Sequence, residues 1–90
     1  MAVRYSIAFV GHVQGVGFRY SATQVAARHP VTGWVRNEPD GSVSCVVEGQ
    51  ADDLEAFVEG VKSARAGHID DVRIVESAAT GEFTGFAVRY

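Results

Sequence analysis

The first segment of the chain alternates between apolar and polar or small residues. Its apolar positions are Val3, Tyr5, Ile7 and Phe9. This period of two predicts a strand with one buried face. Glycines at positions 11, 15 and 17 then predict a loop. The period changes after the loop, and residues 18–29 place apolar side chains on one face of a helix. Pro30 should end this helix, because the residue before a proline is driven out of helical geometry.

A hairpin is expected after this helix. Residues 31–37 predict a second strand, and residues 38–41, Glu-Pro-Asp-Gly, predict a turn. Asp-Gly between two β-rich runs is a strong hairpin signal. Alternation resumes in the third strand at Val43, Cys45 and Val47. Because Cys45 belongs to this apolar set, we expect a core residue rather than a nucleophile.

A second helix is predicted to open at residues 50–53. An aspartate there can cap free N–H groups, and its charge suits the positive end of a helix. The apolar stripe of this helix is Leu54, Phe57, Val58 and Val61. Gly67 is expected to end the helix. A strand at 72–76 and a short terminal strand at 86–90 complete the order β-α-β-β-α-β plus one strand. This order predicts a ferredoxin-like α+β sandwich, with two helices on one antiparallel sheet.

Length and composition narrow the class of protein. The chain has 90 residues, so residues 1–90 are expected to form a single domain. Hydrophobic residues make up 47% and charged residues 21%, which is the balance of a globular chain. One cysteine excludes an internal disulfide and a cysteine zinc cluster. No apolar run is long enough for a membrane span, and no signal peptide is evident. We therefore expect a cytoplasmic protein, and nothing in the composition requires more than a monomer.

The charge is unevenly distributed along the chain. The net charge of −3 argues against general nucleic-acid binding. Residues 1–45 carry four arginines and two carboxylates, whereas residues 46–90 carry four basic and nine acidic residues. No carboxylate precedes Glu38, so an anion bound by the first part of the chain would meet no side-chain repulsion. RNA recognition by this fold needs stacking aromatics on the third strand, and residues 42–48 contain none.

The glycine-rich loop between the first strand and the first helix carries the strongest functional signal. Such a loop exposes several backbone N–H groups in one direction, and with the helix dipole they can hold phosphate or another anion. Gly15 and Gly17 can adopt positive φ and let an anion approach the backbone. Arg19, at the helix start, can bind two phosphoryl oxygens. The loop lacks the Gly-Lys-Ser/Thr of a triphosphate site, and Tyr20 replaces the third glycine of a dinucleotide fingerprint.

Two motifs together resemble the acylphosphatase family. They are Gly-His-Val-Gln-Gly-Val-Gly-Phe-Arg at 11–19 and Gly-Trp-Val-Arg-Asn at 33–37, followed by Asp40-Gly41 and the closing Phe-Ala-Val-Arg-Tyr at 86–90. The resemblance implies a metal-independent hydrolase without a cofactor, which converts an acyl phosphate and water to a carboxylate and inorganic phosphate. Its expected partner is that small molecule alone.

The resemblance also implies roles for individual residues. Arg19 corresponds to the family's phosphate-binding arginine and Asn37 to its water-positioning asparagine, and these two are the expected catalytic residues. The expected phosphate-binding residues are Gln14, Gly15, Val16, Gly17, Phe18 and Arg19. An amide can orient a water molecule without titrating, and phosphoryl transfer needs mainly positioning and electrostatic stabilisation.

The loop and several side chains could also have roles other than catalysis. The loop could serve a non-catalytic anion-binding or regulatory module of the same fold. A third possibility is the acylphosphatase-like domain of a carbamoyl-phosphate-using maturation enzyme, but such domains belong to long, cysteine-rich chains. We expect His12 to be a neighbour of the site rather than a general base. Trp34 and Arg36 share the face opposite Val35 and are expected to stack as an exposed pair.

Overall fold

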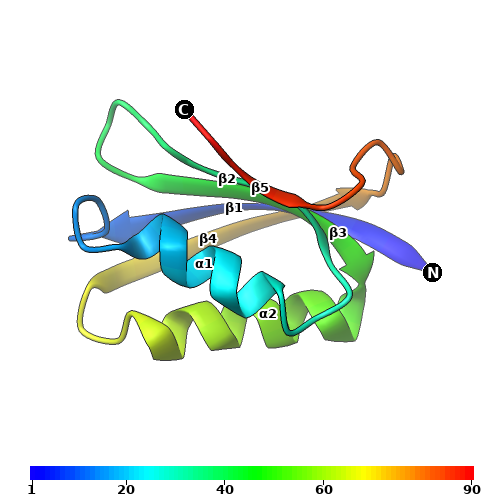
Figure 1. Cartoon of the computed structure of the whole chain (residues 1–90), viewed down its shortest axis with the longest axis horizontal. Coiled ribbons are helices and arrows are strands. Elements are labelled where there is room, and N and C mark those ends of the chain that lie inside the picture. The colour runs from blue at the N-terminus through cyan, green and yellow to red at the C-terminus, as the bar shows by residue number, and fades with distance from the viewer.

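The computed structural model describes all residues from Met1 to Tyr90 and contains five strands and two helices. In chain order they are β1 (Ala2–Gly11), α1 (Phe18–Ala26), β2 (Thr32–Asn37), β3 (Val43–Gln50), α2 (Ala51–Ala64), β4 (Ile69–Ala78) and β5 (Phe86–Arg89). The strands form one sheet in the order β4-β1-β3-β2-β5, and both helices lie on the same side of it (Figure 1). The predicted ferredoxin-like α+β class, with an added C-terminal strand, is confirmed. Neither helix is long and apolar enough to cross a membrane.

The four strands of the core order pair antiparallel, as expected, but the added strand does not. β1 pairs with β3 and β4, and β2 pairs with β3, all antiparallel. β5 pairs in parallel with β2. β4 ends and β5 begins at the same end of the sheet but on opposite edges, so β5 runs in the direction of β2. Residues 79–85 therefore carry the chain from one edge to the other before β5 begins.

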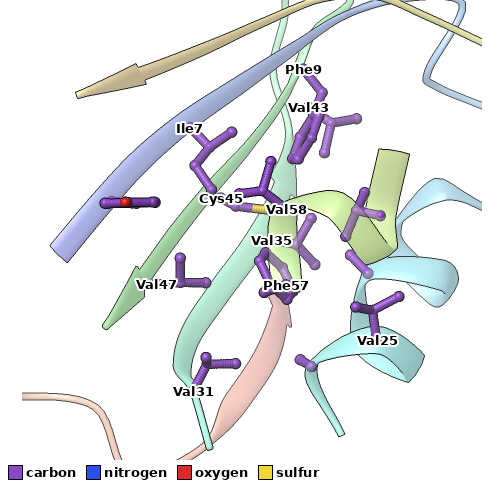
Figure 2. Packing of buried hydrophobic residues seen from close by; sticks show 14 of the residues in the cluster. Ile7, Phe9, Val25, Val31, Val35, Val43, Cys45, Val47, Phe57 and Val58 are labelled. Carbon is purple, nitrogen blue, oxygen red and sulfur yellow. The ribbon is translucent and has the colours of Figure 1, made fainter. Parts of the chain in front are cut away.

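The core lies between the helices and the inner face of the sheet. Ile7, Cys45 and Val35 are opposite one another on three adjacent strands. In Figure 2 their side chains point toward Phe57 of α2 and Val25 of α1. Cys45 is fully buried, and burial raises the pKa of its thiol. The prediction that Cys45 is a core residue is therefore confirmed.

The first helix is shorter than its apolar pattern predicted. It ends at Ala26 rather than His29. The N–H groups of Arg28 and His29 donate to carbonyls three residues back, at 3.0 and 3.2 Å, so the last turn tightens before Pro30. Pro30 has no N–H to donate to the carbonyl of Ala26, four residues back, and its ring would clash with that carbonyl in a continued helix.

The second helix also departs from its prediction at its start. Its N-cap is Gln50, and no side chain makes a capping hydrogen bond, so the predicted aspartate cap is wrong. Asp52 and Asp53 instead lie in the first turn, where their charges suit the positive helix end. Gly60, inside α2, allows the two helices to approach closely, because an added Cβ would lie 2.7 Å from Cγ1 of Val25.

The fourth strand is longer than predicted. α2 ends at Ala64, and Gly67, with φ of +89°, lies in the turn that leads to β4. β4 then pairs with β1 from Ile69 to Ala78, beyond the predicted 72–76. Most of its side chains are exposed, because it is an edge strand. Its ends therefore carry no apolar alternation from which they could be recognised.

A buried carboxylate organises the end of the sheet near the N-terminus. Glu48 is only 5% exposed, and Arg4 donates to it from Nε at 2.8 Å. The backbone N–H groups of Thr80 and Gly81 donate to its two oxygens at 2.9 and 3.0 Å. Burial alone would raise the pKa of Glu48, but these hydrogen bonds outweigh burial and lower the pKa to about 2. Glu48 thereby holds the 79–85 crossing against the sheet.

Candidate active site

Three connections meet at the opposite end of the molecule. The β1–α1 loop, the β2–β3 turn and the α2–β4 connection all lie at the left end of the long axis in Figure 1. The glycine-rich segment and Asn37, which are separated in the sequence, are thus brought to the same end of the fold. This end is the candidate site.

The β1–α1 loop presents a run of free backbone donors. Gly15 and Gly17 have φ of 76° and 77°, the left-handed region that glycine enters at little cost. None of the N–H groups from Gly15 to Tyr20 donates to a backbone or side-chain acceptor within the chain. No side chain caps α1, and its first turn contains no acidic residue. Consecutive free donors at a helix N-terminus suit an anion.

Phe18 anchors this arrangement at the start of α1. Its side chain is 2% exposed, and its ring lies 5.0 Å from that of Phe9. The side chain of Phe18 therefore belongs to the core, and only its backbone N–H can serve a ligand. The same contact joins the helix start to β1 and fixes where the loop must return.

Arg19 and Asn37 line a common pocket with the loop glycines. The pocket has a volume of about 440 Å³. Its lining consists of Val13, Gly15, Gly17, Phe18, Arg19, Tyr20, Thr23, Gln24, Asn37, Val88 and Tyr90. Arg19 forms no salt bridge with any carboxylate of the chain. Its guanidinium instead lies 5.1 Å from the ring centroid of Tyr90, which leaves the charge available to an anion.

Asn37 is placed by the register of the hairpin. It is the last residue of β2 and pairs with Val43 of β3. Its side-chain amide makes no hydrogen bond to the rest of the chain, whereas other half-buried polar groups near it do. A fixed backbone with a free amide suits the binding of water or substrate.

Gln14 connects the loop to the turn that follows Asn37. Its Nε2 donates to the carbonyls of Glu38 and Ser42, at 2.7 and 2.9 Å. An amide nitrogen has two N–H groups, so both are used in the brace. Any contribution of Gln14 to phosphate binding must then come from its backbone. The brace ties the two motifs together across 24 residues.

Glu38, the residue after Asn37, is engaged in contacts of its own. Glu38 accepts hydrogen bonds from Ser44 and from Arg36, and these bonds lower the pKa of Glu38. Glu38 is absent from the pocket lining. By contrast, the largest pocket, of about 550 Å³ between α2 and β4, has three carboxylates and one ammonium group in its lining, from Glu55, Glu59, Glu76 and Lys62. Its net negative charge disfavours a phosphate.

Other sequence candidates lie outside the pocket. His12 is exposed, its ring is 6.2 Å from that of His68, and neither histidine lines the pocket. The predicted stacking of Arg36 on Trp34 is present, at 4.8 Å from the ring centroid, but both side chains are half-buried rather than exposed. Arg89 also stacks on this ring, at 5.0 Å. No group of three or more His, Cys, Asp or Glu side chains is arranged to hold a metal ion.

Sequence reasoning did not place the C-terminal segment or Arg65 at this end. Val88 and Tyr90 of the C-terminal segment line the pocket, although the parallel pairing that brings them there was not predicted. Arg65, which follows α2, donates from Nη1 to the carbonyl of Val16. Val16 itself does not line the pocket. No local spacing signals these contacts, since Arg65 and Val16 are 49 residues apart.

Comparison with known proteins identifies the family of this chain. A model of the acylphosphatase family matches residues 5–88. An acylphosphatase from Salinibacter ruber is 46% identical over 87 residues, which cover 96% of this chain and 92% of that protein. The crystal structure of acylphosphatase from Bacillus subtilis superposes with a TM-score of 0.90 at 36% identity, covering 98% of this chain and 99% of that one.

A longer protein also contains this fold. The crystal structure of HypF from T. kodakarensis matches with a TM-score of 0.82 at 33% identity, covering 96% of this chain but 12% of that one. The relatives from Salinibacter ruber and Bacillus subtilis, in contrast, match over nearly their whole length. The family match extends over both motifs and over almost every element of the fold. On this evidence, the chain belongs to the acylphosphatase family.

Proposed function

We propose that the chain hydrolyses acyl phosphates to a carboxylate and inorganic phosphate in the pocket between the β1–α1 loop and Asn37. One observation carries this proposal. A run of unpartnered N–H groups, an arginine without a carboxylate partner and a free amide converge on the same pocket. The relatives named acylphosphatase support the substrate class.

The proposed chemistry assigns a separate task to each group. The N–H groups of the loop and the Arg19 guanidinium hold the phosphoryl oxygens and offset their charge. Asn37 orients a water molecule in line with the phosphorus. The water oxygen forms the new P–O bond, the bond from phosphorus to the acyl oxygen breaks, and its electron pair leaves on the carboxylate. The water proton passes to solvent or to the phosphate product.

This division needs neither a strong acid nor a titrating base from the protein. A carboxylate is a good leaving group, so it can depart without prior protonation. The remaining requirement is to position the reactants and to stabilise charge on the phosphoryl oxygens. We therefore propose catalysis without a metal or cofactor, by a cytoplasmic monomer whose partner is the small acyl phosphate alone.

The test is hydrolysis of benzoyl phosphate by the purified chain in excess EDTA, with sedimentation measured on the same sample. We expect turnover that resists EDTA. Asn37→Ala should lower kcat by about 10²–10³, the usual cost of removing one positioned polar group, while inorganic phosphate still competes. Arg19→Ala should lose both turnover and competition by phosphate. Arg28→Ala is the matched control, because Arg28 is exposed beyond the other end of α1.

Each result has a distinct reading. Full activity of Asn37→Ala would contradict the role of the amide. Loss of activity in EDTA that returns with a divalent cation would contradict metal independence. A folded wild-type chain that binds phosphate and hydrolyses no acyl phosphate would support the non-catalytic anion-binding module instead.

A further inference from the structure

Arg65 connects the end of the second helix to the back of the glycine-rich loop. It is the C-cap residue of α2 and is half-buried. Its Nη1 donates to the carbonyl oxygen of Val16, and its Nε donates to the carbonyl of Ala64 at 3.0 Å. No carboxylate forms an ion pair with Arg65. The loop is therefore the only partner beyond its own helix end that this guanidinium engages.

The bonded carbonyl belongs to a peptide unit that matters to the site. The Val16 C=O and the Gly17 N–H share one peptide bond, and the chain contains no cis peptide. In a trans peptide these two groups point in opposite directions. Fixing the carbonyl toward Arg65 therefore turns the Gly17 N–H away from Arg65. Gly17 lines the pocket and its N–H has no acceptor within the chain.

Without such a contact, this peptide unit would be difficult to hold. It joins Val16 to Gly17, whose φ of 77° is in the left-handed region, and glycine enters several backbone regions at similar cost. Rotation of the Val16–Gly17 peptide would replace an N–H donor in the pocket with a carbonyl oxygen, which repels phosphate. A hydrogen bond from a charged group is stronger than a neutral one, and it also polarises the N–H at the other end of the peptide.

We propose that Arg65 is a positioning residue for phosphate binding, which holds the Val16 carbonyl so that the Gly17 N–H faces the phosphoryl group. Arg65 acts through the peptide and does not contact the substrate. The inference rests on the proposed function in one respect, that the anion in the pocket is a phosphoryl group. It goes beyond that function by giving α2 a part in building the site.

The experiment measures phosphate binding and turnover separately. Inorganic phosphate is the probe, and its inhibition constant is determined for wild type, Arg65→Ala, Arg65→Gln and Arg65→Lys, with Arg28→Ala as the matched loss of one charge. Loss of a charge-assisted hydrogen bond should weaken phosphate binding by about tenfold in Arg65→Ala. We expect KM for benzoyl phosphate to rise more than kcat falls, because Asn37 is untouched. Arg28→Ala should stay within about twofold of wild type, as surface changes usually do.

Two further measurements separate positioning from charge and from general stability. Arg65→Lys keeps the charge and a donating nitrogen on a shorter side chain, so it should recover part of the affinity that Arg65→Gln loses. In NMR spectra, phosphate should move the Gly17 amide signal of the wild-type chain strongly, and the shift at saturating phosphate should be smaller in Arg65→Lys. These readouts need only folded protein, so they hold if Arg65→Ala alone fails to fold.

The outcomes distinguish this inference from the proposed function. Phosphate affinity and a Gly17 shift equal to wild type in every folded Arg65 variant would overturn the positioning role, whether or not the chain is an enzyme. Phosphate binding that depends on Arg65 in a chain without hydrolytic activity would keep the positioning role and overturn the proposed function. A wild-type chain that neither binds phosphate nor hydrolyses benzoyl phosphate would overturn both.

Discussion

The two ends of the sheet use arginines and backbone N–H groups in opposite ways. At the N-terminal end, Arg4 and the N–H groups of Thr80 and Gly81 are all bound to Glu48. At the other end, Arg19 has no carboxylate partner and the N–H groups of the β1–α1 loop have no acceptor within the chain. The same kinds of donor are satisfied internally at one end and left for a ligand at the other.

The comparison separates stability from function within one small fold. A buried carboxylate with several donors holds two segments together, and removing it leaves unsatisfied groups. Donors without an internal acceptor add little to stability, because water can satisfy them in the absence of a ligand. We therefore expect changes at the Glu48 end to affect unfolding, and changes at the loop end to affect phosphate binding and turnover.

Exchanging the two arginines for alanine tests this separation with the largest effect. Arg19→Ala should lower kcat/KM for benzoyl phosphate by about 10³ or more, since an arginine that stabilises a transferring phosphoryl group is worth 10³–10⁵, and should leave the free energy of unfolding nearly unchanged. Arg4→Ala should lower the free energy of unfolding by about 2 kcal/mol with kinetic constants near wild type. Urea unfolding and steady-state kinetics on both variants check this. The reverse pattern would refute the separation.

A pair of glycines gives a finer test of the same comparison. Gly17 and Gly81 have φ of 77° and 75°, and an added Cβ meets no atom within 4 Å at either position. Alanine at each should therefore cost a similar backbone strain, about 1 kcal/mol. We expect Gly17→Ala to weaken phosphate inhibition about tenfold through loss of aligned donors, whereas Gly81→Ala leaves it unchanged. Equal effects on phosphate inhibition would show that strain, rather than the loop's donors, governs binding.

The smallest expected effect on activity is at Glu48, where pH provides the measurement. The pKa of Glu48 is lowered in the folded chain from the ordinary 4.5 to about 2. Its contribution to stability is therefore complete above pH 4.5 and is lost as the pH falls through 2. Glu48→Gln should be about 2 kcal/mol less stable than wild type at pH 7, and the gap should close between pH 4.5 and 2. Urea titrations across this range, with phosphate inhibition measured at pH 7, test the prediction, and a gap independent of pH would contradict it.

Much of the fold could be predicted because local patterns coincide with elements. The alternation in β1 and the apolar stripe of α2 each mark the face of the element that is buried. The Asp-Gly pair marks the turn between β2 and β3. The ends of β4 could not be recognised, because an edge strand with exposed side chains has little apolar alternation. The parallel direction of β5 depends on the route of residues 79–85, which is fixed by the distant Glu48 rather than by any local signal.

In the candidate site, too, residues in a local sequence pattern could be predicted, whereas those positioned by distant contacts could not. Arg19 and the loop glycines were identifiable because glycines and an arginine at a helix start form a local chemical pattern, and the hairpin brings Asn37 to the same pocket. The braces from Gln14 and Arg65 were not predicted. Their partners are backbone carbonyls 24 and 49 residues away, and a carbonyl carries no residue-specific mark in a sequence. The assigned catalytic roles of Arg19 and Asn37 stay predictions until the variants are measured.

The reactivity of the single thiol reports how often the core of the protein opens. Cys45 is fully enclosed on the central strand β3, and its pKa is raised, so very little thiolate is present near neutral pH. A reagent that attacks thiolate must wait until the sheet and helices separate. The rate at which such a reagent labels Cys45 in the native chain therefore measures how frequently the core opens. No engineered probe is needed to follow these openings.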